Sequence, residues 1–140
     1  MRNNREYAIC KNIATYMRLQ YPAVIFHFDL AGLNLSRAQA GMMKAIQGGR
    51  GWPDLFIAEP GERFKYHGLF LEIKAEGTKL LNKSNSGYAT EHLFDQAMFI
   101  DRLQKKGYKA EFAIGFDEAK SIIDTYMDQI DMHQISNKYF

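Results

Sequence analysis

The stretch GLFLEIK, residues 68–74, decides the fold class of this chain. Its apolar side chains fall on both faces of an extended segment, because successive side chains of a strand point to opposite sides of a sheet. A strand that is apolar on both faces lies inside a sheet whose two faces are covered. The stretch therefore predicts a central, buried strand, in which Glu72 and Lys74 are charged interruptions on one face.

Two further strands are expected before it. Residues 52–58 form a strand candidate, and the turn sequence EPGE at 59–62 joins it to the central strand. A connection this short predicts that the two strands pair antiparallel. Residues 24–28 are rich in β-branched and aromatic side chains and predict another strand.

The first helix is predicted over residues 5–21. Apolar residues recur there at helical spacing, and Pro22 marks the position where a helix is expected to stop. Residues 31–51 are rich in Gly, Ala, Ser, Gln and basic residues. They predict a loop with a helical turn near residues 42–46.

The central strand is followed by a loop, a helix and a strand. Residues 75–89 contain Gly, Asn, Ser and Lys, and their composition predicts a mobile, basic loop. Thr90 is the N-cap candidate of a helix over 91–106, which Gly107 ends. Residues 108–114 alternate apolar and charged side chains and predict a strand. The helix over 91–106 connects this strand to the central one as a right-handed crossover, which implies that the two strands are parallel.

A last helix is expected from an N-cap at Asp117, with residues 122–130 supplying its apolar side. The complete order is helix, strand, strand, strand, helix, strand, helix. This order predicts an α/β fold with a mixed four-stranded sheet flanked by helices. No internal repeat or linker divides the chain, so residues 1–140 are expected to form one domain.

The composition fits a soluble domain. Its 140 residues are 46% hydrophobic, and no apolar run approaches the roughly 20 residues of a membrane span. The polar N-terminus has no signal-peptide pattern, so a cytoplasmic protein is expected. The lone Cys10 and the four scattered histidines have no zinc spacing. A net charge of +2 is far from that of a protein that coats DNA.

The charged residues of the two central strands suggest a metal site. Glu72 and Lys74 share one face, and one strand register brings Asp54 beside them. Two carboxylates, the backbone carbonyl of Ile73 and waters suit the octahedral shell that Mg²⁺ prefers. Lys74 would then orient the nucleophile and stabilise charge on a phosphate.

The same residues have a simpler interpretation, because Glu-x-Lys strands are common on solvated sheet faces, where they form weak cross-strand pairs. Two observations favour a site instead. Glu72 interrupts a buried strand, where a charge needs a partner or a metal. Gln96 lies on the apolar stripe of the helix at 91–106, and Glu6 lies on the apolar face of the first helix.

Together these residues resemble a known family, the VRR-NUC domain, a branch of the PD-(D/E)xK superfamily of restriction-endonuclease-like nucleases. The resemblance covers roughly residues 6–127. It rests on the segments GWPDL at 51–55, GLFLEIK at 68–74, Gln96, Leu103 with GYKA at 107–110, and Gly115 with DEA at 117–119.

The resemblance implies roles for five residues. Asp54 and Glu72 would be metal ligands, Lys74 the catalytic lysine and Gln96 the helix residue near the active site. Glu6 would match the glutamate of the first helix, which contacts the metal through water or has a structural role. Mg²⁺ or Mn²⁺ is the implied cofactor.

The resemblance also implies a substrate. Members of the family, among them stand-alone phage and bacterial proteins, act on branched or flapped DNA, often as homodimers. A structure-selective deoxyribonuclease, including one that cuts four-way (Holliday) junctions, is therefore expected in a bacterial cell. Phosphate contacts are expected from basic residues that flank the site in the sequence, namely Arg37, Lys44, Arg50, Lys79 and Lys83.

Three alternatives stay open. The chain could be a non-specific or nicking nuclease of phage replication or DNA breakdown. It could be a DNA-binding module that does not cut. It could also be an α/β domain in which the acidic pair is structural.

Overall fold

The centre of the protein is the strand β3 (Leu69–Lys74), and all six of its residues are buried. The computed structural model describes residues 4–30, 33–61 and 65–139, with side chains described as far as residue 128. β3 lies inside a single four-stranded sheet of order β1-β2-β3-β4. The other strands are β1 (Phe26–Phe28), β2 (Leu55–Ile57) and β4 (Lys109–Ile114). The predicted α/β fold with a mixed four-stranded sheet is confirmed.

The strand directions also agree with the sequence. β2 pairs antiparallel with β3, and Leu55 lies opposite Leu71. β3 pairs parallel with β4, and Glu72 lies opposite Phe112. The intervening helix α3 (Glu91–Lys105) begins at the predicted N-cap Thr90, whose side chain accepts a hydrogen bond from the backbone N–H of Leu93. Gly107 follows the helix with a φ of 94°, which glycine adopts without strain.

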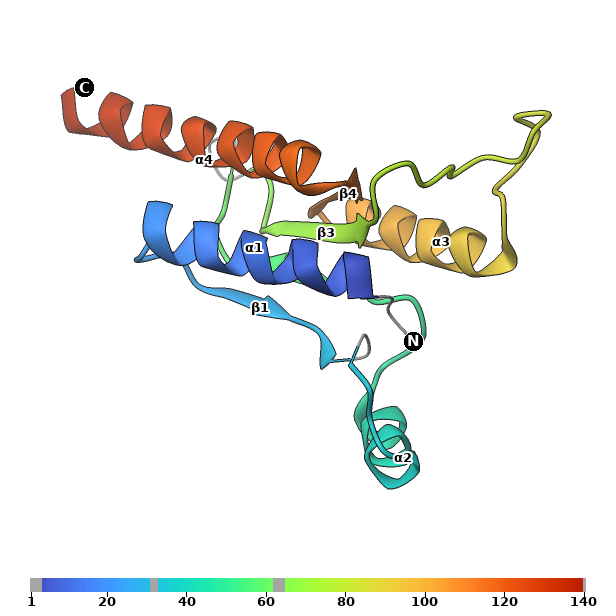
Figure 1. Cartoon of the computed structure of the whole chain (residues 1–140). Coiled ribbons are helices and arrows are strands. Elements are labelled where there is room, and N and C mark those ends of the chain that lie inside the picture. The colour runs from blue at the N-terminus through green and yellow to red at the C-terminus, as the bar shows by residue number, and fades with distance from the viewer. Residues whose placement is uncertain (1–3, 31–32, 62–64, 140) are drawn as a thin grey trace.

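Helices cover both faces of the sheet (Figure 1). α1 (Asn4–Gln20) and α4 (Phe116–Tyr139) pack on one face, where Leu69, Leu71 and Ile73 join the larger core. α3 packs on the other face, where Phe70 joins a second core with Phe99, Ile100 and Leu103. Because side chains alternate along β3, Glu72 and Lys74 point to the α3 side with Phe70. No helix of the described residues is long and apolar enough to cross a membrane.

The segment predicted as a loop over 31–51 contains a full helix, α2 (Arg37–Ile46), so the prediction of a helical turn alone is wrong. The helix starts in a capping box, in which Ser36 and Gln39 exchange side-chain to backbone hydrogen bonds. That signal was present in the sequence and was obscured by the surrounding glycines. None of the residues of α2 is buried, and the helix projects away from the sheet (Figure 1).

One smaller prediction needs correction, and one predicted loop contains local structure that was not predicted. Asp117 is not an N-cap, because β4 ends at Ile114 and α4 begins at Phe116 after the single residue Gly115, so Asp117 lies in the first turn. The loop over 75–89 contains a small hairpin, closed by an isolated bridge between Leu81 and Tyr88. Local hydrogen bonds, which composition does not reveal, give this loop its structure.

A polar cluster joins α1 to α4. The carboxylate of Asp124 accepts hydrogen bonds from Tyr16, from Tyr21 at 2.7 Å and from Lys120 at 2.7 Å. Burial alone would raise the pKa of Asp124, but the hydrogen bonds from Lys120 and the two tyrosines outweigh it and hold the pKa below its ordinary value. Burial and the bond to Asp124 raise the pKa of Tyr21.

Replacing Asp124 by alanine is therefore expected to lower the free energy of unfolding by about 1–2 kcal/mol at pH 7. A folded-state pKa below the unfolded one stabilises the protein above the unfolded pKa, and this contribution is lost as pH falls through the folded pKa. The difference in the free energy of unfolding between wild type and variant should become smaller below about pH 4. Urea unfolding at pH 7 and pH 3 measures it, and an equal difference at both values would contradict the role of the charge.

Candidate active site

Four buried charged or amide side chains stand out in an otherwise apolar interior. Within the part of the chain whose side chains are described, the buried polar or charged residues are Asp54, Glu72, Lys74 and Gln96, each at most 7% exposed. Burying such groups is costly, and apolar side chains of the same size would pack at lower cost. Their placement therefore points to chemistry rather than to stability.

The sheet register brings Asp54 beside Glu72. Leu55 pairs with Leu71, so the antiparallel register, continued by one residue, sets Asp54 opposite Glu72. The side chain of Asp54 turns to the neighbouring strand, where Oδ2 accepts a hydrogen bond from the backbone N–H of Ile73 at 2.7 Å. The backbone carbonyl of Asp54 accepts a bond from the N–H of Asp29 at 2.8 Å. Asp54 is thus held from two sides.

Pro53 removes a backbone hydrogen bond that the carbonyl of Ile73 would otherwise accept. Continuing the same register by a further residue sets Pro53 opposite Ile73. The N–H of Ile73 points to the β2 side, and in a strand the carbonyl of the same residue points to the same side. A residue at position 53 would normally donate its N–H to that carbonyl, but proline has none. The Ile73 carbonyl therefore lies beside Asp54 without a ladder donor from Pro53.

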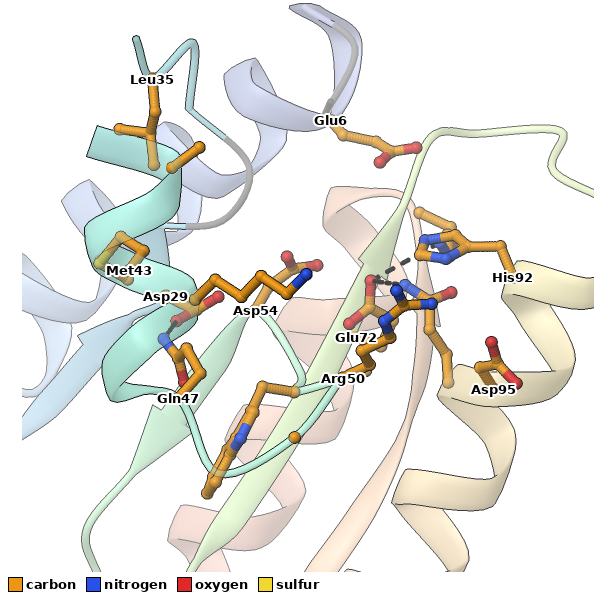
Figure 2. A pocket seen from close by; sticks show the side chains of 17 residues that line it. Glu6, Asp29, Leu35, Met43, Gln47, Arg50, Asp54, Glu72, His92 and Asp95 are labelled. Atoms are coloured by element: carbon orange, nitrogen blue, oxygen red, sulfur yellow. Dashed lines mark hydrogen bonds and ion pairs between the residues drawn. The ribbon is translucent and has the colours of Figure 1, made fainter. Parts of the chain in front are cut away.

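Glu72 points to the face of the sheet that α3 covers, and a residue of α3 holds its carboxylate in place (Figure 2). Its Oε1 accepts a hydrogen bond from Nε2 of Gln96 at 2.8 Å and lies 3.6 Å from Nζ of Lys74. An ionised carboxylate only accepts hydrogen bonds, so the amide of Gln96 must present its nitrogen to Glu72. The Oε1 atom of Gln96 then points away from Glu72. Among the described residues, this buried oxygen has no hydrogen-bond partner.

These residues line one cavity of about 910 Å³. All five residues of the predicted catalytic set lie in its wall: Glu6, Asp54, Glu72, Lys74 and Gln96. Glu6 is half-buried and reaches the cavity from α1, the helix on the other face of the sheet (Figure 2). The cavity thus extends around the end of the sheet.

The predicted DNA-binding residues divide into two groups. Lys44 and Arg50 line the cavity. Arg37, Lys79 and Lys83 are exposed outside the cavity lining, Arg37 at the start of α2 and the two lysines on the loop that follows β3. The structure therefore brings two of the five to the cavity and leaves the other three on the elements beside it.

Four polar residues of the cavity wall were not placed in the site by the sequence. They are Asp29, Gln47, His92 and Asp95. Asp29 and Gln47 are joined by a hydrogen bond of 3.5 Å, and His92 and Asp95 approach from the first turns of α3 (Figure 2). The one signal for the last two is helical spacing, because His92 precedes Asp95 by three positions and Gln96 by four. No sequence spacing marks Asp29.

The donor set fits a hard divalent cation that keeps much of its water. No group of three or more His, Cys, Asp or Glu side chains among the described residues is arranged as a ready metal site. Mg²⁺ does not need such a cage, since it binds through one or two carboxylates, a substrate phosphate and several waters. Asp54 and Glu72 supply oxygen donors on the cavity wall, and the Ile73 carbonyl belongs to the strand residue between the two wall residues Glu72 and Lys74.

Among the comparisons with known proteins, the one with solved structures agrees with the observed fold. The sequence has no match among protein-family models and no significant match among curated proteins. A solved structure described as a VRR_NUC domain protein superposes on the chain with a TM-score of 0.60 and 25% sequence identity. The match covers 92% of this chain and 93% of that chain.

Proposed function

We propose that this chain, which has the restriction-endonuclease-like fold of a VRR-NUC domain, is a metal-dependent endonuclease that hydrolyses DNA phosphodiester bonds, with a preference for branched, flapped or four-way-junction DNA. The observation that carries the proposal is the shared cavity of Asp54, Glu72, Lys74 and Gln96. These are the polar groups that the described part of the chain buries, and they converge on one open space. Their convergence is difficult to explain as a stabilising core.

Asp54, Glu72 and the Ile73 carbonyl would hold Mg²⁺ or Mn²⁺, with Glu6 contacting it through water. When bound, the ion would supply Lewis-acid polarisation of the scissile phosphate. Lys74 lies 3.6 Å from Glu72 and adds a positive charge to the same wall. Its ammonium group would donate hydrogen bonds to the phosphate or to the attacking water and stabilise the negative charge that develops in the transition state.

Gln96 would favour a water molecule over a phosphate oxygen in the space beside Lys74. Its Oε1 is a hydrogen-bond acceptor and faces away from Glu72. A phosphodiester oxygen cannot donate to this acceptor, whereas a water molecule can. The pairing of a lysine donor and an amide acceptor therefore favours a water molecule at this point and orients it for attack.

Replacing Gln96 by leucine, which has a similar volume, is expected to slow cleavage about 10- to 100-fold. The change removes both the donor to Glu72 and the acceptor for water. KM should change little, because no contact to DNA is lost. Single-turnover cleavage measures the effect, with Gln20→Leu at the exposed end of α1 as the control. A rate equal to that of wild type would exclude Gln96 from the mechanism.

Two segments that carry only positive charge would hold the DNA. Residues 30–53 contain three basic residues and no acidic one, and residues 77–90 contain two basic residues and no acidic one. Over the whole chain the charges are nearly balanced, with 18 basic and 16 acidic residues. The first segment includes α2 and lines the cavity at Lys44 and Arg50, and the second forms the loop between β3 and α3 (Figure 1). Basic residues concentrated in this way suit a phosphate backbone.

A homodimer is part of the proposal, since two active sites are required to cut both strands of a junction. Met42 and Ile46 lie one helical turn apart on α2 and are 71% and 80% exposed. A ten-residue helix without buried residues gains stability by packing against another surface. Light scattering of the wild type should give a molecular mass equal to two chains. The Met42→Glu variant should have the mass of a single chain. A monomeric wild type would contradict this arrangement.

One experiment tests the proposed activity as a whole. The purified protein is incubated with linear duplex, flap and four-way-junction DNA, with and without Mg²⁺ or Mn²⁺. Cleavage that requires the divalent ion and is faster on the branched substrates is the expected result. Equal rates on all three substrates would favour a non-specific nuclease, and binding without cleavage would favour a module that does not cut.

A further inference from the structure

An exposed apolar patch lies on the outer side of α3 and on the hairpin that precedes this helix. Four large side chains form it: Leu81 at 46%, Tyr88 at 37%, Phe94 at 49% and Met98 at 43% exposure. The rings of Tyr88 and Phe94 meet edge to face, with centroids 6.3 Å apart. Leu81 is bridged to Tyr88 across the hairpin, and Met98 follows Phe94 by one turn of α3. We call these four residues the aromatic platform, after the rings of Tyr88 and Phe94.

The hairpin that carries half of this platform is held by its own hydrogen bonds. The N–H of Ala89 donates to the carbonyl of Leu80 at 2.8 Å, and the N–H of Asn82 donates to that of Gly87 at 2.9 Å. At the tip, the side-chain oxygen of Asn82 accepts from the N–H of Ser86 at 3.1 Å. Tyr88 therefore projects from a defined scaffold, and ordering it on binding costs little conformational entropy.

The basic residues on the hairpin side of the platform favour a polyanion, while the α3 side carries Glu91 and Asp95 next to Phe94. Lys79 and Lys83 are exposed on the hairpin segment, and no acidic residue occurs between positions 77 and 90. The tip between the lysines and Tyr88 offers the hydroxyl and amide groups of Ser84, Asn85 and Ser86. Aromatic faces combined with lysines and small polar groups are the features by which proteins hold unpaired nucleic acid strands.

The platform lies within reach of the active site. His92, which lines the cavity, lies four positions after Tyr88, so the two Cα atoms are at most about 14 Å apart. That distance corresponds to about four base steps of a DNA strand at 3.4 Å each. A strand that leaves the cavity over the first turn of α3 would therefore meet the platform within a few nucleotides.

We infer that Tyr88 and Phe94 stack on unpaired bases of a DNA strand a few nucleotides from the cleavage point, while Lys79 and Lys83 contact its phosphates. This inference rests on the proposed function, and it assigns the preference for branched or flapped DNA to a particular surface. Fully paired DNA offers no base faces to the platform, so the platform contributes only to substrates that contain unpaired nucleotides.

Binding measurements without divalent ion test the inference separately from cleavage. Fluorescence anisotropy compares a flap substrate with a fully paired duplex of the same length. Tyr88→Ala and Phe94→Ala should each weaken flap binding about 5- to 100-fold and change duplex binding less than about twofold. Tyr88→Phe keeps the ring and should bind like wild type. Leu19→Ala, at an exposed apolar position on α1, is the control.

A second readout reports stacking directly. The base analogue 2-aminopurine, placed in the unpaired strand, should lose fluorescence on binding wild type and Tyr88→Phe but not Phe94→Ala. Equal loss of flap and duplex binding in the alanine variants, or no loss in either, would overturn the inference. So would a change in oligomeric mass in Phe94→Ala with DNA binding intact, because the patch would then bind a second copy.

The two proposals can fail separately. If flap DNA binds through the platform but no substrate is cut in Mg²⁺ or Mn²⁺, the proposed activity is wrong and the platform stands. If DNA is cut in a metal-dependent manner while Tyr88→Ala and Phe94→Ala bind flap and duplex DNA like wild type, the platform is wrong and the activity stands.

Discussion

The Asp54→Asn variant is expected to fold normally and to cut DNA about 10³-fold more slowly than wild type, or not at all. Asparagine keeps an oxygen that can accept the 2.7 Å bond from the N–H of Ile73, so the local structure should be retained. It removes the negative charge that the proposed cation requires. Calorimetric titration with Mn²⁺ should show weakened binding, and single-turnover cleavage should show the loss of rate.

A matched control for this variant is Asp101→Asn. Asp101 also lies on a regular element, but it forms an exposed ion pair with Lys105 near the far end of α3. Its replacement should leave cleavage and Mn²⁺ binding unchanged. Undiminished cleavage by Asp54→Asn would rule out the assignment of Asp54 as a ligand, and loss of folding in this variant would be detected by circular dichroism.

The second large effect is expected at Lys74. Replacing it by methionine keeps an unbranched chain in a site that is 7% exposed and removes only the ammonium group. Cleavage should fall about 10²- to 10³-fold, because the charge that stabilises the transition state is lost. Binding of Mn²⁺ should be retained or strengthened, since a positive charge 3.6 Å from Glu72 is removed.

This opposite response to metal separates the two residues. Asp54→Asn should lose both cleavage and metal binding, whereas Lys74→Met should lose cleavage alone. Lys106→Met, at the exposed C-cap of α3, is the control for the loss of a lysine. If Lys74→Met weakened Mn²⁺ binding as much as Asp54→Asn does, the two side chains would share a structural role and the proposed division of functions would be wrong.

Several parts of the fold could be predicted because their signals are local. The apolar run from Leu69 to Ile73 predicted a central strand, and β3 is buried along its whole length. Thr90 and Gly107 marked the limits of α3 through capping and backbone preferences. The connection of 59–62 predicted an antiparallel pair, and the helix between the last two strands predicted a parallel one.

Other local signals were present but were given too little weight. Ser36 and Gln39 form a capping box at the start of α2, yet the composition of the surrounding segment favoured a loop. Met42 and Ile46 lie at helical spacing, but α2 buries none of its residues against the core. The hairpin at 80–89 depends on backbone bonds between its two arms and on the Asn82 side chain, which accepts from the N–H of Ser86 and from the hydroxyl of Ser84, and these bonds do not follow from composition.

The sequence by itself determined the chemistry available to this protein: two carboxylates, a lysine and a glutamine at positions where strand and helix periodicity direct them inward. Only the tertiary structure decided how they meet. Strand register is set by contacts between residues far apart in the chain, and it is this register that sets Asp54 opposite Glu72 and Pro53 opposite Ile73. The packing of α1 and α3 against opposite faces of the sheet adds Glu6, His92 and Asp95 to one cavity, because no periodicity within a single element relates side chains on different elements.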